Sequence, residues 1–148
     1  MSLLMDLRQL YKKYNLNITG IIHIGAHYGD ELGDYIDHGV QNIILFEPLS
    51  NNFDKLRENC MDLNANIEAH NVALGSKEGN ATMYLSDNDT QSSSILKPKT
   101  HIKEMPWINF EGTEEVEVKT LDSYNIKGYN FINIDVQGYE MEVFKGGK

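Results

Sequence analysis

The sequence has little cysteine, proline or positive charge, and it has no long apolar run. Its single cysteine, Cys60, excludes an internal disulfide and suits a reducing compartment, so we expect a cytoplasmic protein. No apolar run approaches the roughly 18 residues of a membrane-spanning helix, and no charged start with an apolar core resembles a signal peptide. The 22 acidic residues outnumber the 13 basic ones, and the formal net charge is −9. The chain therefore lacks the basic character of a nucleic-acid-binding protein, and we expect neither a nucleic acid nor a membrane as its partner.

The composition that remains is typical of one folded domain. The chain has 148 residues, 41% of them hydrophobic, which is enough to bury a substantial core. Its three prolines leave little room for a proline-rich linker, and no internal repeat or domain boundary is evident. We therefore expect a single domain over residues 1–148.

The first half of the chain alternates between helical and strand patterns. Apolar residues at three- and four-residue spacing predict helices at 3–14 and 30–37, and a third helix that carries Phe53, Leu56 and Cys60 with Ser50 or Asn51 as its cap. Short apolar runs predict strands at 21–24, 42–46 and 67–71, the last followed by residues 72–74. This order calls for an α/β fold with a mostly parallel sheet and helices on both faces.

The pattern changes in the second half. Residues 81–85 and 115–120 read as strands, and we expect them to pair antiparallel. The polar stretch between them, residues 86–114, is long enough to be a lid or a partly disordered insertion, and its scattered apolar residues favour a partly ordered lid. A last strand is predicted at 131–134, beside the first strand, and a last helix at 138–144.

Three features with chemical potential fall at predicted strand ends. Gly25 and Gly29 form a tight turn between a strand and a helix, where a ligand can approach the backbone closely. Glu47 follows Gly25 by 22 residues, near the spacing expected for a carboxylate that binds ribose hydroxyls. Asp135 ends the last strand and is the best candidate for chemistry, as a general base, a metal ligand or a positioning group. The alternatives are a solvated Glu47 before a proline turn and an Asp135 that only caps the next helix.

Two histidines and a second carboxylate complete the set of candidates. His23 alternates with apolar neighbours, so we interpret it as a core histidine with a hydrogen-bond partner. His27 lies in the glycine turn and could contact a cofactor through its backbone. Glu140 lies five residues after Asp135, where it could face the site or favour the helix N-terminus. The five scattered histidines and one cysteine show no zinc spacing, and we expect no bound metal, although an oxygen-ligated ion at Asp135 stays open.

Several short motifs occur in a fixed order along the chain: Ile24-Gly25-Ala26-His27-Tyr28-Gly29, Leu45-Phe46-Glu47-Pro48, Asn71-Val72-Ala73-Leu74-Gly75, Ser92-Ser93-Ser94, Thr120-Leu121-Asp122 and Ile132-Asn133-Ile134-Asp135-Val136-Gln137-Gly138-Tyr139-Glu140. With these motifs, the chain resembles the FkbM-type family of S-adenosylmethionine-dependent class I methyltransferases over roughly residues 21–147.

The resemblance implies an O-methyltransferase with S-adenosyl-L-methionine as its cofactor and a hydroxyl on a sugar, glycan or small metabolite as its acceptor. It implies a Rossmann-like methyltransferase sheet and places Asp135 and Glu140 at the catalytic centre. The implied cofactor contacts are Gly25, Ala26, His27 and Gly29 around the methionine part, Glu47 on the ribose, Asn71 and Ala73 near the adenine, and Ser93 and Asp135 beside the transferred methyl group.

The chain also departs from the family pattern. His23 stands where many members have aspartate, and Gln137 stands where glutamate is commonest. The family's sheet has seven strands, so we expect this chain to lack the C-terminal strands of the full fold, unless self-association in a homo-oligomer supplies the missing edge.

Two rival functions remain open at this stage. A nicotinamide-dependent oxidoreductase fits less well, because its pyrophosphate favours a G-x-G-x-x-G turn and this chain lacks the middle glycine. A truncated module that binds the cofactor without turnover is the other alternative.

Overall fold

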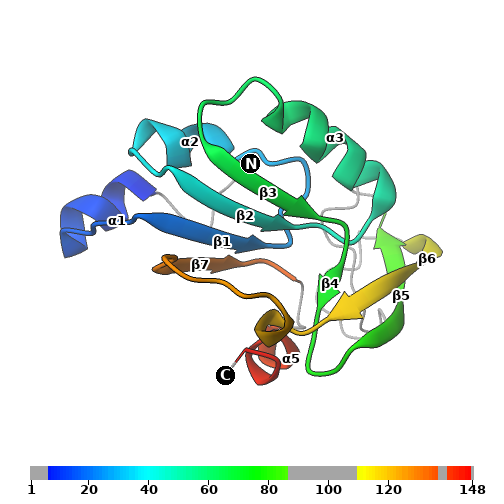
Figure 1. Ribbon diagram of the computed structural model, residues 1–148. Helices are drawn as coiled ribbons and strands as arrows, with labels where there is room; N and C mark the ends of the chain where they lie inside the picture. The colour runs from blue at the N-terminus through cyan, green and yellow to red at the C-terminus, as the bar shows by residue number, and fades with distance from the viewer. Residues whose placement is uncertain (1–6, 87–109, 137–139, 148) are drawn as a thin grey trace.

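A computed structural model of the chain describes residues 7–86, 110–136 and 140–147 (Figure 1). The main sheet has four parallel strands in the order β3-β2-β1-β7. These strands are β1 (Gly20–Ile24), β2 (Asn42–Phe46), β3 (Asn66–His70) and β7 (Phe131–Ile134). The expected parallel sheet is therefore confirmed, and so is the position of the last strand beside the first.

Helices cover both faces of this sheet (Figure 1). One face carries α2 (Leu32–Asp37) and α3 (Ser50–Cys60), and α1 (Leu7–Tyr14) packs at its border. The other face carries the 3-10 helix η1 (Leu121–Ser123) and α5 (Glu140–Lys145). None of the helices in the described ranges has the length and apolar character needed to cross a membrane.

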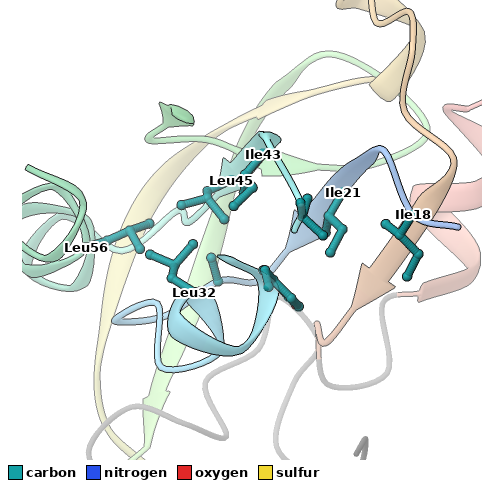
Figure 2. Close-up of a cluster of buried hydrophobic side chains, with 9 residues drawn as sticks. Ile18, Ile21, Leu32, Ile43, Leu45 and Leu56 are labelled. Carbon is teal, nitrogen blue, oxygen red and sulfur yellow. The ribbon is translucent and has the colours of Figure 1, made fainter. Parts of the chain in front are cut away.

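The alternation of side chains along the strands creates two cores. On one face, Ile21 of β1 with Ile43 and Leu45 of β2 packs against Leu32 of α2 and Leu56 of α3, as Figure 2 shows. The intervening strand residues point the other way because successive strand side chains face opposite sides. They form the second core, which contains Ile22, Ile24, Ile44, Phe46, Val72, Leu74 and Val143.

A smaller sheet of three strands, in the order β4-β6-β5, stands beside the carboxyl ends of the main strands (Figure 1). The strands are β4 (Ala73–Leu74), β5 (Gly79–Ser86) and β6 (Phe110–Lys119). β5 and β6 pair antiparallel, as expected, and β4 pairs parallel with β6. Val116 and Val118 are buried in a third core, which also confirms the predicted alternation of β6.

Several predicted boundaries need correction. α2 begins at Leu32, two residues later than expected, and β6 begins at Phe110, so it includes the last residues of the segment expected as a lid. Residues 87–109 of that segment lie outside the described residues. Tyr14, counted in the apolar stripe of α1, is 58% exposed.

The predicted side-chain cap of α3 is wrong. Leu49 occupies the N-cap position and makes no side-chain cap bond, and Ser50 already belongs to the helix. Two carboxylates accept the first N–H groups instead: Leu49 N donates to Glu47 Oε2 at 2.9 Å, and Ser50 N donates to Glu114 Oε2 at 3.0 Å. A carboxylate two residues before the N-cap and one from β6 therefore replace the cap that the sequence pattern suggested.

Candidate functional site

The glycine turn lies where the carboxyl ends of β1, β2 and β7 meet. Gly25 N and Ala26 N both donate to the carbonyl oxygen of Phe46, at 2.9 and 3.0 Å, and Asp135 N donates to the carbonyl of Ile24 at 2.9 Å. Gly25 has a φ of +83°, and a Cβ there would overlap the carbonyl oxygen of Asp135. Only glycine fits this close approach between two strand ends.

The rest of the turn is equally constrained. His27 has a φ of +53° and Gly29 a φ of +79°, both in the left-handed region. A Cβ on Gly29 would lie 2.7 Å from the Cδ1 atoms of Leu32 and Leu56. The turn therefore packs between β1 and the helices α2 and α3, at the edge of the sheet where open α/β folds bind ligands.

Glu47 joins the turn after β1 to the turn after β2. Its Oε1 accepts a hydrogen bond from His27 N at 2.8 Å and its Oε2 accepts one from Leu49 N at 2.9 Å. The side chain of Asn52 in α3 also hydrogen-bonds to this carboxyl group. Glu47 and Asn52 are both buried. The structure thus brings two of the expected cofactor residues, His27 and Glu47, into direct contact.

Burial dominates the electrostatics of Glu47. Loss of hydration raises the pKa of its carboxyl group to about 7, although the hydrogen bonds from Leu49, His27 and Asn52 favour the ionised form. The nearby charge of Glu114 raises the pKa further. Glu47 is therefore not the solvated residue of the alternative interpretation.

Asn71 and Ala73, the residues expected near the adenine, both contact the segment that follows β2. Asn71 Nδ2 donates to the carbonyl oxygens of Glu47 and Pro48, at 3.0 and 2.9 Å, and so supports the turn after β2. Ala73 belongs to β4, and its side chain is buried in the core of the small sheet with Leu49. A cofactor contact of Ala73 would therefore involve its backbone.

Asp135 lies at this edge together with Glu31, an acidic residue that the sequence analysis did not single out. Asp135 is exposed, and Glu31 directly precedes α2. Burial raises the pKa of the Glu31 carboxyl, and the charges of Asp30 and Asp135 raise it further. The charge of Asp135 thus acts on Glu31, and the backbone carbonyl of Asp135 lies against Gly25.

His23 is a core residue, as predicted. It is 2% exposed, and its Nδ1 lies 3.0 Å from the hydroxyl oxygen of Tyr35 in α2. Asn133 Nδ2 donates to the same hydroxyl at 2.9 Å. Burial lowers the pKa of His23 to about 4, so the ring is neutral at physiological pH.

Over the ranges that it describes, the structure does not connect the remaining candidate residues to the glycine turn. Glu140 is the first residue of α5, and within the described residues no hydrogen bond or ion pair joins it to the glycine turn. Ser93 and Gln137 lie outside the described residues. No group of three or more His, Cys, Asp or Glu in the described parts of the chain is arranged to hold a metal ion.

The groups present fit a nucleoside ligand with an amino-acid part. A carboxylate has about four lone-pair sites, and three protein donors on Glu47 leave room for a ligand hydroxyl. The carboxyl ends of β1, β2 and β7 provide the usual place for such a ligand. Fold and site together define a Rossmann-like α/β fold of the class I methyltransferase type.

Comparisons with known proteins agree with this class. The model of the methyltransferase FkbM domain matches residues 23–148, so the chain belongs to the FkbM methyltransferase family. It is 29% identical over 139 residues to the "2-O-methyltransferase NoeI" of Sinorhizobium fredii (strain NBRC 101917 / NGR234), an alignment that covers 86% of this chain and 57% of the relative. It is 30% identical over 125 residues to "Methyltransferase 1" of Beauveria bassiana (strain ARSEF 2860), which covers 70% of this chain and 48% of the relative. The chain spans about half the length of these curated relatives.

Two residues of the site were missed at the sequence level. Asn52 is a buried polar residue that supports Glu47, and its signal is weak because asparagine is common near helix starts. Glu31 had a stronger signal, since the acidic pair Asp30-Glu31 directly follows Gly29 at the start of a helix.

Proposed function

We propose that this protein is an S-adenosylmethionine-dependent O-methyltransferase that acts on a hydroxyl of a sugar or small metabolite. The observation that carries the proposal is the contact of the buried Glu47 carboxyl with the N–H of His27, at the meeting point of three strand ends. Membership of the FkbM family supports the reaction class. The name of the rhizobial relative, a 2-O-methyltransferase, supports a hydroxyl acceptor.

Each part of the site has a role in this proposal. The turn that contains Gly25, Ala26, His27 and Gly29 borders the amino-acid part of the cofactor, and its own N–H groups are used within the protein to fix the shape of the turn. Glu47 accepts a ribose hydroxyl, and the segment from Asn71 to Ala73 borders the adenine. The bound cofactor supplies a methyl group activated by a sulfonium. A cytoplasmic location stays a prediction from the single cysteine.

Asp135 is the proposed general base. As the acceptor oxygen forms its bond to the methyl carbon, the carbon–sulfur bond breaks and its electron pair stays on sulfur. Asp135 takes the hydroxyl proton during this step and later gives it to water. Proton transfer of this kind contributes about 10²–10⁴-fold to rate. Ser93 and Glu140 are further candidates beside the reacting groups.

The test combines binding and turnover. Calorimetric titration with S-adenosylmethionine, S-adenosylhomocysteine and NAD should show saturable binding of the first two ligands only. Release of S-adenosylhomocysteine in the presence of a panel of sugars and sugar derivatives then identifies the acceptor. Binding of NAD alone would contradict the proposal, and binding without turnover on any acceptor would favour a non-catalytic module.

Asp135→Asn tests the proposed base. This variant should bind S-adenosylhomocysteine within about threefold of the wild type but lose about 10²-fold or more in kcat, because the amide cannot accept the proton. Asp62→Asn, a change at an exposed residue that follows α3 and lies outside the proposed site, is the control. Unchanged turnover in Asp135→Asn would remove Asp135 from the catalytic centre.

A further inference from the structure

A chain of three hydrogen-bonded side chains connects β1, β7 and α2. His23 of β1 lies opposite Asn133 of β7 in the parallel register. The hydroxyl of Tyr35 in α2 lies between them, 3.0 Å from His23 Nδ1 and 2.9 Å from Asn133 Nδ2. His23 and Tyr35 are almost completely buried, at 2% and 1% exposure.

The chemistry of these groups fixes the direction of each proton. The amide nitrogen of Asn133 can only donate, so the Tyr35 oxygen is the acceptor of that bond. The Tyr35 oxygen could also accept a hydrogen bond from a protonated His23 Nδ1, but the buried Tyr35 proton would then have no acceptor among the described residues. We therefore assign this proton to an unprotonated His23 Nδ1. Burial lowers the pKa of His23 to about 4 and raises the pKa of Tyr35, so both groups are neutral at physiological pH. The single ring proton of His23 is therefore on Nε2.

The three residues lie on the elements that surround the glycine turn: β1 before it, α2 after it and β7 beside it. His23 lies two residues before Gly25, and Tyr35 faces it from the helix that follows Gly29. The bond between them thus joins the strand that enters the turn to the helix that leaves it. Asn133 adds the strand that carries Asp135 at its end.

We propose that Tyr35 and Asn133 are positioning residues, which lock His23 as the Nε2–H tautomer and hold β1, α2 and β7 in the arrangement that the cofactor requires. The effect on the cofactor rests on the proposed function, whereas the tautomer is a property of the protein alone. Neither residue touches the reacting groups in this proposal.

Three substitutions test the proposal against a matched control. Tyr35→Phe removes the hydroxyl and keeps the ring. Tyr11→Phe is the same change at a tyrosine that packs against the same core but whose buried hydroxyl has no hydrogen-bond partner among the described residues. Asn133→Asp replaces the amide donor with an acceptor of the same shape, so the Tyr35 proton should turn to residue 133 and His23 should donate from Nδ1. His23→Gln assigns the His23 ring signals.

Nitrogen-15 NMR of the histidine rings reports the tautomer, and calorimetry reports the affinity for S-adenosylhomocysteine. We expect one Nε2–H tautomer in the wild type and in Tyr11→Phe, a mixture in Tyr35→Phe, and a shift toward the Nδ1 proton in Asn133→Asp. The dissociation constant should rise in Tyr35→Phe by up to about tenfold, because a smaller fraction of the protein then has the arrangement that binds, and one hydrogen bond sets the upper limit of this effect. It should stay unchanged in Tyr11→Phe.

Each other result contradicts a defined part of the proposal. A wild-type His23 that is protonated on Nδ1, or a tautomer unaffected by Tyr35→Phe, would show that Tyr35 does not fix the Nε2–H tautomer. An altered tautomer with unchanged affinity would overturn the positioning role. A wild type that does not bind S-adenosylhomocysteine would refute the proposed function and the link to the cofactor, while the NMR result would still decide whether the lock exists.

Discussion

Replacing Glu47 by glutamine should remove a specific part of the pH dependence of folding. The Glu47 carboxyl group is buried, and its pKa is raised from 4.5 to about 7, mainly by loss of hydration. In the unfolded chain the same group ionises near its ordinary value. Between pH 4.5 and 7 the folded state therefore keeps a proton that the unfolded state has lost. Stability must then fall as the pH rises through this window.

The size of the effect follows from the two pKa values. Their difference corresponds to about 3 kcal/mol of unfolding free energy, which is fully present below pH 4.5 and lost above pH 7. A glutamine at position 47 does not titrate, so the unfolding free energy of Glu47→Gln does not fall between pH 4.5 and 7 for this reason. Glutamine also presents an N–H group to one of the two backbone donors, His27 N or Leu49 N. That mismatch lowers stability by about 1–3 kcal/mol at every pH. The test therefore compares how the unfolding free energy of each protein changes with pH, and not its value at one pH.

The measurement is urea unfolding of both proteins at pH 5, 6, 7 and 8 at constant ionic strength. We expect the unfolding free energy of the wild type to fall relative to Glu47→Gln by about 2–3 kcal/mol from pH 5 to pH 8. For the control Glu58→Gln, at an exposed position of the same helix α3, the unfolding free energy should depend on pH as it does in the wild type. Parallel curves for Glu47→Gln would refute the raised pKa. A wild type that gains stability with pH relative to Glu47→Gln would show that the hydrogen bonds outweigh burial.

Two further pairs of substitutions test the packing around the site. Gly25→Ala should lower stability by at least about 2 kcal/mol and abolish binding of S-adenosylhomocysteine, because φ is +83° and the new Cβ overlaps the Asp135 carbonyl. Gly33→Ala in α2, where a Cβ meets nothing within 4 Å, should instead stabilise by about 0.5 kcal/mol in thermal unfolding, and equal effects of the two changes would contradict this reading. Leu56→Ala, at a fully buried position of α3, should cost about 2–5 kcal/mol. Met61→Ala, at 79% exposure, should change stability by less than about 0.5 kcal/mol, and a cost for Leu56→Ala no larger than this would argue against its place in the core.

The fold was predictable because its signals are local. β2 was expected at 42–46 and is found at Asn42–Phe46, since a continuous apolar run is typical of a parallel strand covered on both faces. β4 was not recognised as a strand of a second sheet. Its two residues pair with β6, more than forty positions away in the chain, and a partner at that distance leaves no pattern in a short segment.

The site was predictable in position but not in its internal contacts. The sequence placed Gly25, Glu47 and Asp135 at strand ends, and the parallel register brings those ends together. Periodicity and spacing do not report which polar groups bond to each other. The interactions of Asn52 with Glu47 and of Asp135 with Glu31 depend on how α3 and α2 dock on the sheet, so only the structure reveals them.

The hydrogen bonds of Glu47 hold the turn after β1 against the start of α3. Burial costs a carboxylate several kcal/mol of hydration free energy, and hydrogen-bond donors offset part of this cost. Here the donors come from His27 in the first turn, Leu49 before α3 and Asn52 within α3. Any movement of one of these segments leaves the carboxylate short of a donor, so the two turns and the helix are held as a unit. A ligand hydroxyl that supplies a further hydrogen bond favours the ionised form, and its binding therefore stabilises the same arrangement that the turn requires.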